Sequence, residues 1–87
     1  MQRQLEESLE ISNVLNSNKE YQQWLDSQEL LIIDASSVSR IDAAGLQALA
    51  SLFLSAKQAH IEIRLINVPE LLTNGIELLG LANIFEC

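Results

Sequence analysis

Residues that could do chemistry gather between Asp34 and Leu46, a stretch that reads DASSVSRIDAAGL. It holds two carboxylates, Asp34 and Asp42, and such a pair can bind a metal ion or divide the roles of general acid and general base. Three hydroxyl groups accompany them, from Ser36, Ser37 and Ser39. Each could accept a phosphoryl group, although serines in loops more often form turns and caps.

The other residues that a catalytic or metal site needs are not found in this stretch. The sole histidine, His60, lies far downstream, and the sole cysteine is Cys87. The three glycines are too dispersed for a phosphate-binding loop. We therefore expect no catalytic residue, no metal and no cofactor, and the chain is predicted not to be an enzyme. Asp42 has a simpler use as the N-cap of a helix, and Asp34 as an acceptor that orders the loop or shapes the face that a partner meets.

Two strongly patterned segments flank the loop and would hold it in place. Before it, Leu30-Leu31-Ile32-Ile33 is continuously apolar, which predicts a strand that is covered on both faces in a parallel sheet. After it, a helix is predicted from Asp42 to about Gln58. The buried face of this helix would carry Leu46, Leu49, Phe53 and Ala56, and its polar face Gln47, Ser51, Ser55 and Gln58.

The rest of the chain alternates between segments with the two-residue period of a strand and segments with the 3.6-residue period of a helix. Leu9 and Ile11 alternate with polar residues as in a strand, and Ser17 with Glu20 matches a capping box at the start of a helix. The stripe of this helix would be Tyr21, Trp24 and Leu25. A partly covered strand follows at 61–66, and Pro69 suits the first position of a last helix. That helix is predicted to continue through Asn74-Gly75, with Leu71, Leu72, Ile76 and Leu79 as its stripe and Gly80 as its C′ residue.

Strands and helices alternating in this way predict an α/β fold with a largely parallel sheet and right-handed crossovers. With 87 residues, the chain is expected to form a single domain, 1–87. Partners of such sheets usually bind at the carboxyl ends of the strands, which here is the segment 34–45.

Composition limits the classes of partner. The net charge is −7, from 12 acidic and 5 basic residues, which argues against nucleic acid and suits a basic protein partner. The longest apolar run, Leu30 to Ile33, is too short to span a bilayer, and residues 1–7 lack the apolar run of a signal peptide. We therefore expect a cytoplasmic protein without membrane insertion.

The central stretch resembles the signature of the STAS domain family, which includes the anti-sigma factor antagonists. The family pattern is a strand ending in Asp, a loop containing Ser, a second Asp, a small hydroxyl residue, a small residue, Gly and Leu. The match continues through a Val68-Pro69-Glu70 helix entry and a late Leu79-Gly80-Leu81, and so covers about residues 8 to 85. The resemblance implies a STAS-like mixed, largely parallel sheet with helices packed on it. It also implies an extra first strand, for which only Gln2–Glu6 is available and which is therefore expected to be short.

In the family, the hydroxyl after the second Asp is phosphorylated by an anti-sigma kinase, and the unphosphorylated form captures that kinase. Here this position is Ala43, followed by Ala44, so phosphoryl transfer to it is impossible. The chain is then either a constitutive binder or carries a substitution that mimics the unphosphorylated state. The resemblance implies a protein partner, either an anti-sigma kinase or another signalling protein.

An alternative is the small STAS subunit of a phospholipid-trafficking ABC transporter of bacteria, which binds the transporter's ATPase. The approach Ser39-Arg40-Ile41-Asp42 is similar to that branch and to STAS proteins of chemotaxis systems, and Ala43 favours such branches. For either function, a partner would dock on the loop and the helix start. The predicted binding residues are Asp34, Ser36, Ser37, Ser39, Arg40, Asp42, Ala43, Ala44, Gly45, Leu46, Gln47 and Leu54. Leu54 is expected to form a small apolar patch there with Ala43 and Ala50. The chain itself is expected to be a monomer or a weak dimer.

Overall fold

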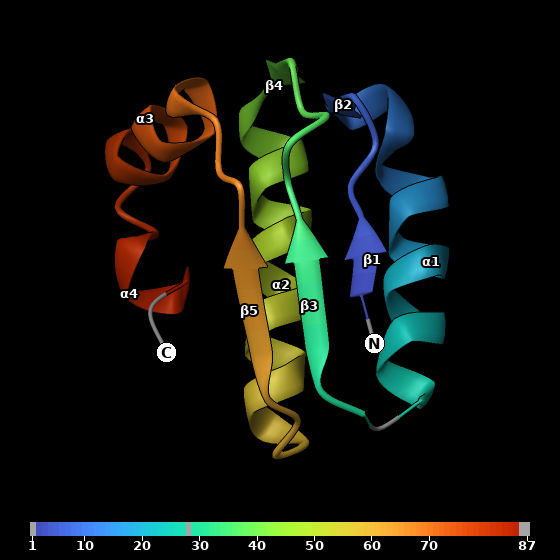
Figure 1. Ribbon diagram of the computed structural model, residues 1–87. Coiled ribbons are helices and arrows are strands. Elements are labelled where there is room, and N and C mark those ends of the chain that lie inside the picture. The colour runs from blue at the N-terminus through green and yellow to red at the C-terminus, as the bar shows by residue number, and fades with distance from the viewer. Residues whose placement is uncertain (1, 28, 86–87) are drawn as a thin grey trace.

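The computed structural model describes residues 2–27 and 29–85, which form a parallel α/β structure (Figure 1). In chain order the elements are β1 (Gln2–Gln4), β2 (Ser8–Leu9), the 3-10 helix η1 (Ile11–Asn13), α1 (Val14–Asp26), β3 (Leu31–Asp34), β4 (Arg40–Ile41), α2 (Ala43–Gln58), β5 (Ile63–Ile66), α3 (Glu70–Leu78) and α4 (Ala82–Phe85). The predicted fold class is therefore confirmed.

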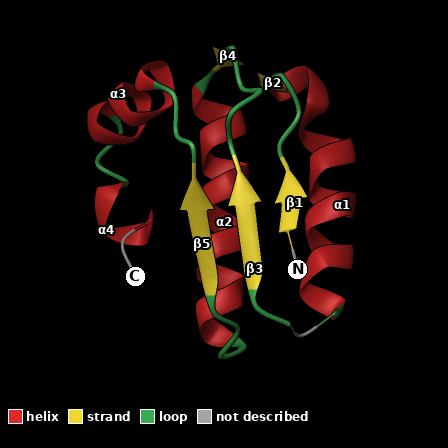
Figure 2. Cartoon of the chain, in the orientation of Figure 1, coloured by secondary structure: helices red, strands yellow, loops and turns green. Residues whose placement is uncertain are grey.

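The strands form two small sheets in which every pair is parallel. The larger sheet has the order β1-β3-β5, and the smaller one pairs β2 with β4. The expected short first strand is β1, at an edge of the larger sheet. The sequence did not predict β4 or the second sheet. Figure 2 shows the loop after β3 crossing to β4 beside β2, which brings the predicted binding segment against the residues that follow β1.

β3 differs from the prediction of a strand covered on both faces. Its burial alternates: Leu31 and Ile33 are fully buried, whereas Ile32 and Asp34 are half-buried. In Figure 1, α2 lies behind the larger sheet and no helix that the structure describes crosses the viewed face. Continuous apolar character therefore does not mark two covered faces here, because only one face meets the helices.

α2 confirms its prediction along its whole length. The helix runs from Ala43 to Gln58, and the four stripe residues Leu46, Leu49, Phe53 and Ala56 are all buried. The four residues assigned to the polar face are exposed, as expected. Burying an apolar stripe of this size against the sheet and α1 is the main reason that the helix start is held in one place.

The first helix begins earlier than predicted. Ser17 is buried in the second turn of α1 and bonds to Tyr21, so the capping box with Glu20 is wrong. The strand predicted through Ile11 is also wrong, because β2 ends at Leu9 and Ile11 opens η1. The N–H of Ile11 finds its acceptor on Asp42, which is distant in sequence. A tertiary cap of this kind leaves no local signal. The predicted stripe holds: Tyr21 and Trp24 are buried and Leu25 is half-buried.

α3 passes through Asn74-Gly75 without a break, as predicted. Pro69 is its N-cap rather than its first residue, and Gly80 ends it with a φ of 68°. The Leu81 N–H bonds to the Ile76 carbonyl, which completes a glycine-terminated helix end.

The end of α2 has the same geometry without a glycine, which makes a stabilising substitution available. His60 has a φ of 60°, and the Ile61 N–H bonds to the Ala56 carbonyl at 2.8 Å. Because L-residues are strained in this region, His60→Gly is expected to raise the free energy of unfolding by about 0.5–1 kcal/mol. Urea denaturation measures the change. His60→Ala is the control, since it removes the imidazole but keeps the strain, and a gain as large as that of the glycine variant would contradict the explanation.

Candidate functional site

The loop after β3 is ordered from within. The Ser36 N–H donates to Asp34 Oδ1 at 2.9 Å, and this hydrogen bond is the main reason that the pKa of Asp34 lies below its ordinary value. Ala35 and Val38 are buried and anchor the loop, whereas Ser36, Ser37 and Ser39 are exposed. The predicted role of Asp34 as an acceptor for loop N–H groups is confirmed.

The loop is also tied to the segment that joins β1 and β2. The N–H groups of Ser39 and Arg40 both donate to the Glu7 carbonyl, at 2.8 and 3.2 Å. The Ser39 hydroxyl donates to Glu7 Oε1 at 3.2 Å, and Gln4 Nε2 donates to the Ser37 hydroxyl. Ser37 and Ser39 thus have partners in β1 and in the segment after it, which fixes their position on the surface.

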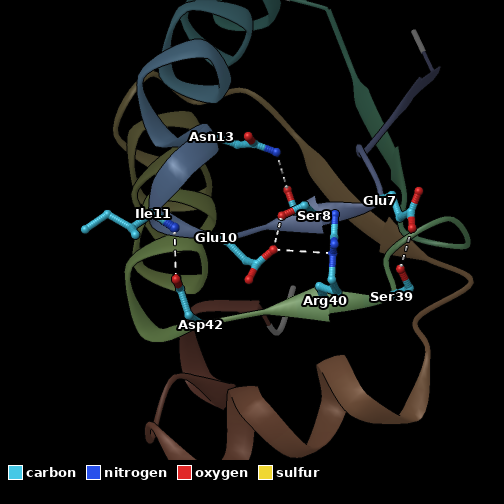
Figure 3. Close-up of polar contacts among 8 residues, drawn as sticks. All are labelled: Glu7, Ser8, Glu10, Ile11, Asn13, Ser39, Arg40 and Asp42. Atoms are coloured by element: carbon cyan, nitrogen blue, oxygen red, sulfur yellow. Dashed lines mark hydrogen bonds and ion pairs between the residues drawn. The ribbon is translucent and has the colours of Figure 1, made fainter.

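Asp42 joins two elements through its two carboxylate oxygens. Oδ1 accepts from the Gly45 N–H at 2.8 Å and caps α2, as predicted. Oδ2 accepts from the Ile11 N–H at 2.9 Å (Figure 3). These two bonds, the one from Gly45 first, hold the pKa of Asp42 below its ordinary value of 3.8. A single side chain therefore fixes the start of η1 beside the start of α2.

Substitutions of Asp42 should distinguish its role as the cap of α2 from its hydrogen bond to η1. Asp42→Ala loses both bonds and is expected to lower the midpoint of thermal unfolding by several degrees. Asp42→Asn should lose less, because asparagine is a good N-cap but its one carbonyl oxygen cannot accept from both N–H groups.

The destabilisation by Asp42→Ala should depend on pH. With a folded-state pKa below 3.8, the carboxylate stabilises the fold fully above the ordinary value and loses this effect as pH falls through the folded-state pKa. Thermal unfolding between pH 2 and pH 7 should show a constant difference between the wild type and the alanine variant well above the ordinary value of 3.8, and a difference that narrows as pH falls below it. If the difference in unfolding midpoint between the two proteins did not change with pH, the two hydrogen bonds would not depend on an ionised Asp42, and the explanation would be wrong.

A second polar cluster lies beside Asp42 and links β2 and η1 to β4 (Figure 3). Glu10 Oε1 accepts a hydrogen bond from the Ser8 hydroxyl at 2.5 Å and lies 3.4 Å from Arg40 Nε. Asn13 Nδ2 donates to the Ser8 carbonyl at 3.4 Å. Arg40 is solvent-exposed, but it lies in β4 rather than in a loop and pairs with Glu10. Such an exposed pair contributes little stability, but it directs the guanidinium toward the start of η1.

The structure divides the predicted residues at the helix start into an inner and an outer set. Gly45 and Leu46 are buried, and Ala44 is half-buried. A Cβ atom on Gly45 would lie 1.8 Å from the Leu9 carbonyl oxygen, so this glycine permits close packing of α2 on β2. These three residues shape the site from below, while Ala43 and Gln47 are exposed and form its surface.

Leu54 does not belong to this surface. It is exposed, but it lies three helical turns after Ala43, which is about 16 Å along α2. Ala50, which was expected to join the two in one patch, is buried. The predicted apolar patch of Ala43, Ala50 and Leu54 is therefore wrong, because the burial of Ala50 breaks it.

Sequence reasoning missed the apolar residues at the start of α1. The sequence pattern places Ile11 in a strand and predicts no role for Leu15, yet these residues are 71 % and 80 % exposed. Their spacing of four residues was the available signal, since it places two side chains on one side of a helix.

Comparison with known proteins places the chain in a family. Within residues 2–27 and 29–85, no helix is long and apolar enough to cross a membrane. No curated protein matches the chain. A family model described as "Mlab, STAS domain" matches residues 4–86, which is nearly the whole chain. This agrees with the signature at 34–46 and with the parallel α/β architecture. The chain therefore belongs to the STAS domain family.

Proposed function

We propose that this protein is a non-enzymatic regulatory module that docks a partner protein through the start of α2 and the loop before it. The docking surface, called here the α2-start face, consists of the exposed residues Ser36, Ser37, Ser39, Arg40, Ala43 and Gln47. The proposal rests on the observation that hydrogen bonds from several neighbouring segments hold this face in one position. Asp42 caps α2 and holds η1, and the loop bonds to Glu7. A rigid, exposed helix start suits recognition because little side-chain and loop freedom is lost on binding.

The residue types on this face favour binding over a phosphorylation switch. Ala43 has no hydroxyl, so the module stays in the state that captures its partner. Ser39 is a poor substitute acceptor, because its hydroxyl donates to the Glu7 carboxylate and a phosphate there would face a like charge. The first candidate partner is an anti-sigma kinase, by analogy with the anti-sigma factor antagonists of the family.

The missing hydroxyl favours a second candidate partner, the ATPase of a phospholipid-trafficking ABC transporter. A permanent transporter subunit needs no phosphoacceptor, and its binding face would stay in one state. In either case we propose a cytoplasmic bacterial protein that binds neither nucleic acid nor lipid, which fits its net charge of −7.

Affinity capture tests the proposal and separates the two partners. The tagged chain is incubated with detergent-solubilised lysate of its source organism, and retained proteins are identified by mass spectrometry. Retention of a soluble kinase of the anti-sigma class supports the first candidate, and joint retention of an ATPase with a membrane permease supports the second. Retention of neither class, with and without added ATP, would contradict the proposed function.

A further inference from the structure

A polar cleft lies between the C-terminal ends of α1 and α2. Its volume is about 630 Å³, which is within the range of pockets that hold small molecules. In Figure 1 both helices end at the lower end of the view, whereas the start of α2 and β4 lie at the upper end. The cleft is lined by residues from the two helices and from the turn after α2: Gln22, Leu25, Asp26, Ser55, Ala59, His60 and Ile61. The cleft is therefore separate from the α2-start face.

The polar side chains around the cleft offer hydrogen-bond acceptors. Gln22 Nε2 donates to Asp26 Oδ1 at 3.3 Å, so the Gln22 amide keeps its carbonyl oxygen as an acceptor and Asp26 keeps its second carboxylate oxygen. The Ser55 hydroxyl adds an acceptor, and so does the His60 imidazole in its neutral form. Four acceptors around one cleft suit a ligand that carries several N–H donors.

The electrostatic surroundings of the cleft favour a cation. The C-terminal ends of α1 and α2 are the negative ends of two helix dipoles, and Asp26 adds a carboxylate. α1, which the structure describes throughout, has no basic residue in its last turn. The basic residue in the last turn of α2 is Lys57, whose Nζ donates to the Ile84 carbonyl at 2.8 Å and is thus directed toward α4. An anionic ligand is disfavoured here by like charge.

His60 keeps a strained backbone at this cleft. Its φ of 60° is the left-handed conformation that glycine adopts after a helix, as Gly80 does after α3. A histidine in this conformation costs stability, and strain of this kind is concentrated at functional sites such as ligand clamps. The imidazole lines the cleft, which gives the strained residue a use that a glycine could not supply.

Apolar side chains extend the cleft along the two helices. Leu25 is half-buried and Ile61 is buried, and both line the cleft. A second hollow of about 150 Å³ shares Gln22, Leu25 and Ser55 with the cleft and continues it to Leu52, one turn earlier on α2. The two hollows together form an elongated site with an acidic, polar end and a partly apolar extension.

We propose that this cleft binds a small organic cation, an alkyl guanidinium, with its guanidinium group among Asp26, Ser55 and His60 and its alkyl stem along Leu25. A guanidinium group is planar, carries five N–H donors and pairs well with a carboxylate, so it matches acceptors that come from two helices. An ammonium group places three donors at one point and would reach fewer of these side chains. The inference is independent of the proposed function, because the cleft and the α2-start face have no residue in common.

NMR titration of the isotope-labelled protein tests the ligand and its site together. The probes are butylguanidinium and its neutral isostere butylurea, which has the same stem and shape but no charge. We expect butylguanidinium to shift the amide signals of residues 22–26 and 55–61, with a dissociation constant of about 1 mM for so small a ligand. Butylurea should bind at least tenfold more weakly. No shift with butylguanidinium, equal binding of both probes, or shifts confined to the α2-start face would overturn the inference.

An arginine-containing tripeptide is the third probe, because the side chain of a protein could also supply a guanidinium group. Weaker binding of the tripeptide than of butylguanidinium supports a free small molecule as the ligand. Equal or tighter binding of the tripeptide would assign the cleft to a protein segment and overturn the proposed ligand.

Asp26→Asn tests the carboxylate. This variant is expected to weaken butylguanidinium binding at least tenfold while the unfolding midpoint is kept, because it removes a negative charge from the C-terminal end of a helix. Glu70→Gln is the matched control, since it removes the same charge from α3 and should bind like the wild type. Equal affinities of the two variants would contradict the assignment of Asp26.

His60→Gly tests the strained residue. It should raise the free energy of unfolding and yet weaken butylguanidinium binding several-fold. A histidine without a part in the site would give the gain in stability alone, so unchanged affinity of this variant would contradict the assignment of His60.

Discussion

Gly45→Ala is expected to destabilise the protein by about 3 kcal/mol, the upper end for overpacking of a core. The added Cβ would lie 1.8 Å from the Leu9 carbonyl oxygen, 2.1 Å from the Leu9 carbonyl carbon and 2.8 Å from the Glu10 nitrogen. All three are backbone atoms, so no rotamer change can relieve the overlap. α2 would have to move away from β2, which strains the bond from the Asp42 N–H to the Leu9 carbonyl.

Urea denaturation measures this loss, and Gly75→Ala is its control. A Cβ on Gly75 would meet Ile41 Cδ1 at 2.6 Å and Leu46 Cδ1 at 2.9 Å, which are the ends of flexible side chains. These can adjust, so about 1 kcal/mol is expected for the control. If Gly45→Ala were as stable as the wild type, the close approach of α2 to β2 would be wrong.

Ala43→Asp is expected to weaken partner binding about a hundredfold without unfolding the protein. The exposed Ala43 is the first residue of α2, where an added carboxylate is favourable to the helix dipole. On a docking face, however, the same charge must be desolvated and sits beside Asp42, which is already ionised. Stability and affinity should therefore change independently.

Ala43→Ser is the matched control, because it restores a small hydroxyl without charge. Affinity of both variants for the captured ATPase is measured by calorimetry, and thermal unfolding is followed in parallel. The serine variant should bind within a few-fold of the wild type. If the aspartate variant also binds like the wild type, the partner docks elsewhere and the assignment of the α2-start face fails.

The parts of the fold that follow hydrophobic periodicity could be predicted from the sequence. The bounds of α2, its buried stripe and the glycine-terminated end of α3 depend on local patterns, and the structure has each of them. The cap formed by Asp42 and the hydrogen bond by which Asp34 orders its loop could also be predicted, because each joins residues that are close in sequence.

The missed features depend on contacts between distant segments. Asp42 Oδ2 fixes the start of η1, which runs directly into α1, so the helical segment begins before Ser17 and the capping box there was a false start signal. The two-residue strand β4 carries no period and exists because it pairs with β2. The close approach of Gly45 to Leu9 likewise cannot be seen without the fold. The sequence therefore predicted the loop and helix start that form the candidate site, but it did not predict that they lie against η1.

Amide hydrogen exchange of the protein, alone and in complex with the captured ATPase, tests the central claim most directly. Residues 36–47 carry the proposed docking face, and each amide reports its own protection. We predict that binding slows exchange in this segment, while α3 exchanges as in the free protein. Protection confined to α3 and α4, with residues 36–47 unchanged, would contradict the assignment of the start of α2 as the docking site.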